Sequence, residues 1–217
     1  MGRIAAILIA MVLLLTGCAD NGDPGVQPVV LYDVVELTQN DANGSQFLLY
    51  HGEGEPVTLT YDRYIGDKTA IGESLLICYV PANGEAYKSG PIELRGAYAI
   101  TNVAMELEMP SMIEGWDADP VYLESMWLAG SKLNVRCRLP VSGEARRLAL
   151  AADVTTLGDA VPQLYLAHNL SDDTPTYDRN YYISFDISLL MGTHMYEGVD
   201  IHVNNANLPT SLFHISF

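Results

Sequence analysis

From residue 29 to the C-terminus, the chain alternates between short runs of β-branched, aromatic and aliphatic residues and stretches rich in Gly, Pro, Asn and Asp. Apolar runs of this length, bounded by turn-forming residues, are typical of β-strands. The strand period of two is clearest in Val57–Tyr61, where Val57, Leu59 and Tyr61 share one face. The sequence after residue 28 contains no long segment with helical periodicity. It therefore predicts an all-β protein.

The first part of this region, residues 29–107, is predicted to contain five strands, of which the first and last are long. A small Greek-key barrel of the oligonucleotide/oligosaccharide-binding (OB) kind is built from five such strands. We therefore expect an OB-like barrel domain over residues 29–107. A connection from Met105 to Asp119 follows, and we place the domain boundary near residue 109. The predicted strands are Val29–Thr38, Phe47–Tyr50, Val57–Tyr61, Leu75–Val80 and Pro91–Asn102.

The second part, residues 110–217, shows a steady rhythm of seven short predicted strands separated by turn signals. Short strands at this spacing indicate an antiparallel, immunoglobulin-like β-sandwich. This part is therefore predicted to form a second β domain. Its predicted strands are Val121–Leu128, Leu133–Leu139, Arg147–Val154, Leu164–Asn169, Tyr182–Leu189, Val199–Val203 and Phe213–Phe217.

The N-terminus has the pattern of an export signal. Arg3 supplies a positive charge, and the apolar run Ile4–Leu15 is too short for a permanent membrane-spanning helix. In a bacterial lipobox, the cysteine thiol receives a diacylglyceryl group and the chain is cut just before it. We therefore expect residues 1–17 to be a lipoprotein signal peptide and Cys18 to be the lipidated first residue. The lipobox consists of Leu15, Thr16, Gly17 and Cys18.

Residues 18–28 contain turn formers and acidic residues with nothing to bury, which predicts a flexible lipidated tether. Position 19 is Ala and not the Asp of an inner-membrane retention signal, so the outer membrane is favoured. Asp20 and Asp23 resemble the acidic export signal of surface lipoproteins. We expect an outer-membrane lipoprotein held by the lipid on Cys18, with both the periplasmic and the cell-surface face left open.

The charge of the chain argues against nucleic acid as a partner. The formal charge is −16, and the loss of Arg3 with the signal peptide makes it −17. Residues 29–107 carry four basic and eleven acidic side chains, and residues 108–217 carry six and fourteen. A phosphate backbone is bound by Lys and Arg, which release its counterions, so this surface would repel it.

Together with the lipobox and the tether, several later segments resemble the NigD-like lipoproteins of Bacteroidetes. The resemblance covers essentially the whole mature chain. It implies an N-terminal OB-like domain and a C-terminal β-sandwich, and the family name comes from a bacteriocin gene cluster for which an immunity role was proposed. It supplies no catalytic residues and no cofactor. The segments are Gly72–Pro81, Trp127, Leu133-Asn134, Leu164–Asn169 and Phe185–Ser188.

Histidines are the first candidates for chemistry. His168 shares strand parity with Leu164 and Leu166, so we expect a core histidine without a nucleophile to activate. His202 and His214 fall on the polar parity of consecutive strands. A hairpin with a residue sum of 416 would place them directly opposite each other, about 5 Å apart at Cβ. Two ligands do not make a zinc site, so exposed polar positions are the favoured interpretation.

The remaining candidates also favour structural roles. His51 and His194 have no partner at an informative spacing, and we expect no metal site. Acidic loops containing several carboxylates can bind calcium, but solvated loops are the commoner outcome. Cys78 and Cys137 are expected to be unpaired core thiols, because they lie in different predicted domains. The acidic loop residues are Asp117, Asp119, Asp172, Asp173 and Asp178.

These observations predict a non-enzymatic, lipid-anchored envelope protein that acts by protein recognition or protection and needs no cofactor. A glycan- or nutrient-binding surface lipoprotein is the alternative, because Tyr177, Tyr181 and Tyr182 could form an aromatic platform. A fimbrial subunit is a third reading, disfavoured because no Arg for maturation lies between Cys18 and Arg63, and a hydrolase is a distant fourth. We expect recognition by exposed loops. The candidate loops are 39–45, 51–56, 171–180 and 204–211.

Overall fold

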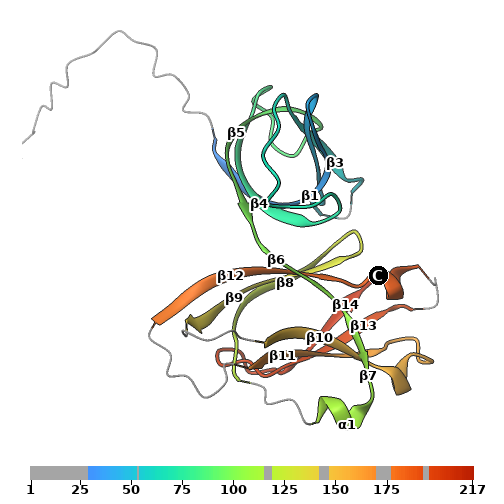
Figure 1. Cartoon of the computed structure of the whole chain (residues 1–217). Coiled ribbons are helices and arrows are strands. Elements are labelled where there is room, and N and C mark those ends of the chain that lie inside the picture. Colours follow the sequence, from blue (N-terminus) through green and yellow to red (C-terminus); the bar gives the residue numbers. More distant parts are fainter. Residues whose placement is uncertain (1–28, 53, 115–118, 142–146, 170–176, 193–195) are drawn as a thin grey trace, which may run out of the picture.

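The computed structural model describes residues 29–52, 54–114, 119–141, 147–169, 177–192 and 196–217. Figure 1 shows a barrel followed by two stacked sheets, with the sheet that contains β12 nearer to the barrel. The all-β prediction is confirmed. The predicted signal peptide, the lipobox and the tether lie outside the described residues.

The barrel is closed and contains five strands in the order β1-β2-β3-β5-β4. Alternate residues along each strand point inward, and together they form one hydrophobic core. The five strands are β1 (Leu31–Asp41), β2 (Gly44–Leu49), β3 (Val57–Tyr61), β4 (Ser74–Pro81) and β5 (Gly90–Ala99). The buried core residues are Val35, Leu37, Phe47, Leu49, Leu59, Leu75, Ile77, Tyr79 and Ile92.

The second region packs a four-stranded sheet, β6-β12-β9-β8, against a five-stranded sheet, β14-β13-β11-β10-β7. The prediction of a purely antiparallel sandwich is wrong, because β12 pairs with β6, β10 with β7, and β11 with β13 in parallel. The strands are β6 (Thr101–Ala104), β7 (Glu106–Glu108), β8 (Tyr122–Ala129), β9 (Lys132–Val141), β10 (Arg147–Asp153), β11 (Gln163–Asn169), β12 (Tyr177–Asp186), β13 (Gly198–Val203) and β14 (Leu212–Ser216).

The chain leaves the barrel and enters the two-sheet region at Ile100. The predicted last strand of the first region is divided there, because β5 ends at Ala99 and β6 starts at Thr101. Both β6 and β7 precede the predicted boundary near residue 109, yet they pair with β12 and β10. Each is a single short strand added in parallel to the edge of a sheet, an arrangement that local periodicity does not reveal.

The core between the two sheets contains Phe185, Leu133 and Leu164, all fully buried. Cys78 and Cys137 are both buried, and neither forms a disulfide within the described ranges, as predicted. Cys137 belongs to the core between the sheets. Cys78 instead has the outward parity of β4, opposite Tyr32 of β1, and lies outside the barrel core.

A buried hydrogen bond joins the barrel to the nearer sheet. The hydroxyls of Ser74 in β4 and Ser184 in β12 lie 2.9 Å apart. The Asn102 side chain of β6 also bonds the backbone N–H and carbonyl of Ser74, at 2.8 and 2.9 Å. These contacts fix the barrel over the face of β12.

Helices in the described part of the chain are short. They are α1 (Pro110–Ile113), α2 (Ser188–Met191) and the 3-10 turn Val154–Thr156. Within the described ranges, none of them has the length and apolar character needed to cross a membrane.

Candidate functional site

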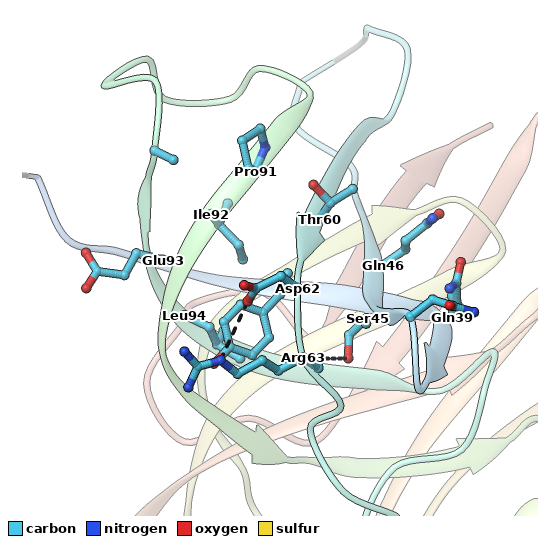
Figure 2. Close-up of a pocket in the computed structure, with 14 residues that line it drawn as sticks. Gln39, Ser45, Gln46, Thr60, Asp62, Arg63, Pro91, Ile92, Glu93 and Leu94 are labelled. Atoms are coloured by element: carbon cyan, nitrogen blue, oxygen red, sulfur yellow. Dashed lines mark hydrogen bonds and ion pairs between the residues drawn. The ribbon is translucent and has the colours of Figure 1, made fainter.

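A groove rimmed by polar side chains opens in the barrel wall where β3 and β5 separate, and we call it the barrel groove (Figure 2). Its volume is about 570 Å³. Outward-facing polar side chains form its rim, and Tyr61 and Leu94 at the edge of the core contribute its apolar floor. Other residues that line the groove are Gln39, Gln46, Thr60, Asp62, Arg63, Pro91, Ile92 and Glu93.

The groove exists because β3 and β5 pair over only two positions, Leu59 with Gly90 and Thr60 with Pro91. Beyond Pro91, only β4 pairs with β5. The Pro91 carbonyl accepts a hydrogen bond from the Ala82 N–H of the β4–β5 connection at 3.0 Å. Because backbone groups alternate in direction along a strand, the C=O of Ile92 and the N–H and C=O of Leu94 point into the groove, whereas the Ile92 N–H serves the pairing of Thr60 with Pro91. The barrel thus presents an open strand edge.

Local sequence fixes the turn below the groove. Gly44 has φ +118°, and a Cβ there would overlap the Tyr61 carbonyl oxygen, so only glycine fits this hairpin position. The buried Ser45 hydroxyl donates to the Arg63 carbonyl at 2.8 Å. Asn40 holds the same segment, accepting from the Ile65 N–H at 3.0 Å and donating to the Gly66 carbonyl at 2.8 Å.

The side chains around the groove suit binding better than catalysis. Gln46 and Thr60 form no side-chain hydrogen bond within the described part of the chain. The Arg63 guanidinium lies 3.8 Å from the Asp62 carboxylate, with both side chains largely exposed, so this ion pair is weak. Neither His nor Cys is among the described residues that line the groove. It therefore offers hydrogen-bonding groups, one cation, two carboxylates and an open backbone edge.

Comparison with known proteins supports this fold. No protein-family model matches the chain, and no curated protein matches its sequence. A protein of unknown function from Bacteroides vulgatus ATCC 8482 is 17% identical, with a TM-score of 0.71, covering 87% of this chain and 91% of that one. A NigD-like immunity protein from Bacteroides caccae ATCC 43185 is 18% identical, with a TM-score of 0.61, covering 87% and 92%.

This chain has the NigD-like fold. The predicted resemblance is therefore confirmed at the level of structure. A protein provisionally named a lipoprotein, from Bacteroides fragilis NCTC 9343, shares the fold at 14% identity and a TM-score of 0.57, covering 87% of this chain and 96% of that one. None of these three similar structures carries the name of an enzyme.

In the NigD-like fold of this chain, His168 is a core residue, as predicted. It lies in β11 opposite Leu148 and is fully buried. The sequence offered His51 no partner at an informative spacing, and the structure places an aromatic ring against it. Its ring stacks on Tyr87 with centroids 3.7 Å apart, because the β2–β3 and β4–β5 loops meet at that end of the barrel. His194 lies outside the described residues.

The predicted pairing of His202 with His214 is wrong, because the observed register is shifted by two residues. The register has a residue sum of 414, so His214 lies opposite Asp200 and His202 opposite Leu212. His214 Nδ1 is 2.8 Å from Asp200 Oδ1, and this hydrogen bond, followed by one from Gln163, lowers the pKa of Asp200. Burial lowers the pKa of His202, although the Asp200 charge acts in the opposite direction.

His202 also hydrogen bonds Gln163, with Nε2 and Oε1 2.8 Å apart, and stacks on Tyr165. This outer face is therefore a network of mutually satisfied polar groups, which fits a structural role. Within the described ranges, no three His, Cys, Asp or Glu residues are placed to hold a metal ion. Of the acidic loop candidates, Asp117, Asp172 and Asp173 lie outside those ranges.

A hydrogen-bonded pair of a carboxylate and a tyrosine lies in the barrel, away from the barrel groove. Asp33 accepts a hydrogen bond from the Tyr79 hydroxyl at 3.0 Å. Burial raises the pKa of the Asp33 carboxyl, while this hydrogen bond and nearby His51 act in the opposite direction. Burial, followed by the Asp33 charge, also raises the pKa of Tyr79. The pair satisfies two polar groups at the barrel end and does not contact the barrel groove.

The loops predicted for recognition do not all line the barrel groove. From 39–45, the residues Gln39 and Asn43–Ser45 line the barrel groove, although most of this segment is strand. Residues 171–176 lie outside the described residues. Sequence reasoning did not find Thr60 and Arg63. The available signal was Pro91, because a strand proline lacks an N–H and is confined to strand starts, edges and bulges.

Proposed function

We propose that this protein is a non-enzymatic lipoprotein of the bacterial cell envelope that recognises another protein through the barrel groove. The lipobox pattern supports lipidation of Cys18, the signal peptide over residues 1–17 and the tether over 18–28. The position 19 residue supports the outer membrane. A tethered protein meets its partner at a raised local concentration, so a weak contact can be effective.

We further propose that the barrel is OB-like. Its five strands close in the order β1-β2-β3-β5-β4, with β3 and β5 parallel. OB folds bind ligands on the strand 2–3 face between the connections after strands 1 and 4, and the barrel groove occupies the same region. For the second region we propose an immunoglobulin-like sandwich with three added parallel pairings. The two regions are proposed as separate domains that meet near Ile100.

The open edge of β5 is the observation that carries this function. An unpaired strand edge can accept an extended peptide, because backbone hydrogen bonds supply affinity and alternate side chains supply specificity. A segment added beside Ile92 and Leu94 would pass Gln46 and Thr60 on the rim and place one side chain near Tyr61 and Leu94 on the floor. Arg63 favours an acidic residue in that segment.

One protein with a similar structure, from Bacteroides caccae, is named as an immunity protein. Protection against a protein toxin would be one form of the recognition proposed for this chain. The acidic surface supports a protein partner over nucleic acid.

Site-specific photo-crosslinking in the native membrane tests the proposal. A benzoylphenylalanine probe replaces Thr60 in the groove, and a matched probe replaces Ser125, an exposed residue of β8. The proposal predicts one discrete protein adduct from the Thr60 probe and none from the Ser125 probe, with loss of the adduct in Cys18→Ala. Adducts from Ser125 with none from Thr60 would contradict it, as would capture of lipid or glycan alone at Thr60.

A further inference from the structure

A second groove, which we call the junction groove, lies between the end of the barrel and β12, and its volume is about 420 Å³. The chain passes from β5 into β6 beside it (Figure 1). Because β6 pairs with β12 only from Ile183 onward, the first half of β12 has β9 on one side and the junction groove on the other. This groove shares no lining residue with the barrel groove.

Aromatic side chains dominate the walls of the junction groove. Tyr98 from β5 is 55% exposed, and Tyr181 and Tyr182 from β12 are half-buried. Thr101 and Asn180 add a hydroxyl and an amide, and both are exposed. A concave site at the meeting of two domains, with aromatic walls and a few polar groups, is typical of small-ligand sites, and its volume falls within their usual range.

The charge of the junction groove is opposite to that of the whole protein. Its described lining includes Arg179 and contains neither Asp nor Glu, whereas the chain has a formal charge of −16. Arg179 forms no ion pair with any described carboxylate, and its guanidinium carbon lies 6.0 Å from the centre of the Tyr181 ring. The nearby Arg136 is instead paired with Glu124 at 2.7 Å. Arg179 is therefore available to a ligand anion.

We propose that the junction groove binds an acidic saccharide. The apolar face of a sugar ring packs on flat tyrosine rings such as those of Tyr98 and Tyr182, since these rings have apolar faces and a polar tip. Sugar hydroxyls can donate to and accept from Asn180 and Thr101. A carboxylate or sulfate on the sugar matches the planar donors of Arg179, which bind such groups in a bidentate way. A neutral saccharide would leave this cation unused.

Calorimetric titration of the full-length chain in detergent tests the proposal. The probes are an oligogalacturonate, a chondroitin sulfate oligosaccharide and a neutral maltooligosaccharide of equal length, together with a glutamate-rich peptide of equal charge. At least one acidic saccharide should bind, and the maltooligosaccharide at least tenfold more weakly. Comparing the two acidic probes distinguishes carboxylate from sulfate.

Variants then assign binding to the groove. Arg179→Gln should weaken acidic-saccharide binding at least tenfold and remove most of its salt dependence, with partial rescue in Arg179→Lys. Tyr98→Ala should weaken binding about fivefold or more. Tyr122→Ala and Arg95→Gln, which change exposed residues outside the groove, should bind like the wild type. Far-UV circular dichroism checks folding, and Asn180→Ala replaces any variant that fails to fold.

Three outcomes would overturn the proposal. They are no binding of either acidic saccharide at 10 mM, equal binding of the neutral saccharide or the peptide, and wild-type affinity in both Arg179→Gln and Tyr98→Ala. The barrel groove lies elsewhere, so photo-crosslinking from Thr60 is unaffected by any of these results.

Discussion

The polar side chains of the two regions are used differently. In the two-sheet region they pair with one another, as in the contacts of Lys132 with Asp186 and of Arg136 with Glu124, both at 2.7 Å. These pairs lie across strands, where they stabilise the sheet. Polar groups there are largely committed to the fold.

In the barrel groove, by contrast, Gln46 and Thr60 have no side-chain partner among the described residues, and Arg63 is held only loosely. The backbone edge of β5 is open at the same place. Polar groups left without a partner beside an unpaired strand edge add little to stability. They are therefore the groups available for recognition.

The largest expected effect tests whether the two cores are independent. Phe47 fills the barrel core and Phe185 the core between the sheets, and both are fully buried. Each Phe→Ala change should cost about 3–5 kcal/mol in its own core. Trp116 and Trp127 both belong to the second part of the sequence. Tryptophan fluorescence during urea unfolding should therefore shift strongly in Phe185→Ala and little in Phe47→Ala. An equal shift in both would mean one cooperative unit.

Gly44 in the barrel and Gly198 in the five-stranded sheet allow the backbones of the two regions to be compared. A Cβ at Gly44 or at Gly198 would overlap a carbonyl oxygen of the neighbouring strand, but only Gly44 has a positive φ. Gly44→Ala should therefore destabilise the protein by about 1–3 kcal/mol more than Gly198→Ala, because of the added backbone strain. Urea denaturation followed by circular dichroism measures this difference. Equal losses would show that the hairpin at Gly44 relaxes.

The ion pair in the two-sheet region should contribute more to stability than the ion pair beside the barrel groove. Burial tends to raise the pKa of Asp186, but hydrogen bonds from Lys132 and Ser188 bring it below its ordinary value. The stabilisation is therefore present above the unfolded pKa and is lost as pH falls through the folded pKa. Asp186→Asn should cost about 0.5–1 kcal/mol at pH 7, since the pair is partly exposed. Asp62→Asn beside the barrel groove should change stability by under about 0.5 kcal/mol. A larger loss from Asp62→Asn would reverse the comparison.

The smallest effect concerns His202 on the outer face of the five-stranded sheet. Its pKa is lowered by burial, so between the folded pKa and the ordinary histidine pKa of about 6.5 mainly the unfolded state binds the proton. Stability should therefore rise with pH across this window in the wild type. His202→Gln should flatten that rise by a few tenths of a kcal/mol. Thermal unfolding at several pH values measures this rise in both proteins. An unchanged slope of stability against pH in His202→Gln would show that His202 does not cause the rise.

Much of the fold follows from local sequence because strand parity is a local property. The in–out alternation of Val57–Tyr61 and the core positions of His168 and Cys137 were predictable, since neighbouring residues of the same strand determine them. The segment Thr101–Ala104 was assigned to the wrong region, because its parallel partner in β12 is about 80 residues away.

The candidate site was harder to predict, because register and strand separation depend on distant parts of the chain. A register error of two residues placed His202 opposite His214, although both lie on the polar face as expected. The barrel groove depends on where β3 leaves β5, which no single segment encodes. Tyr181 and Tyr182 were identified as candidates, but their meeting with Tyr98 across the junction was not.

Backbone amide hydrogen exchange of β5 tests the central claim most directly. Exchange is compared between the free full-length protein and the complex captured in native membranes through the Thr60 probe. If a partner segment adds to the open edge, the amide of Leu94 should exchange at least about tenfold more slowly in the complex. The Glu93 amide faces β4 and should change little. Unchanged exchange at Leu94 in a complex that has formed would contradict recognition through the barrel groove.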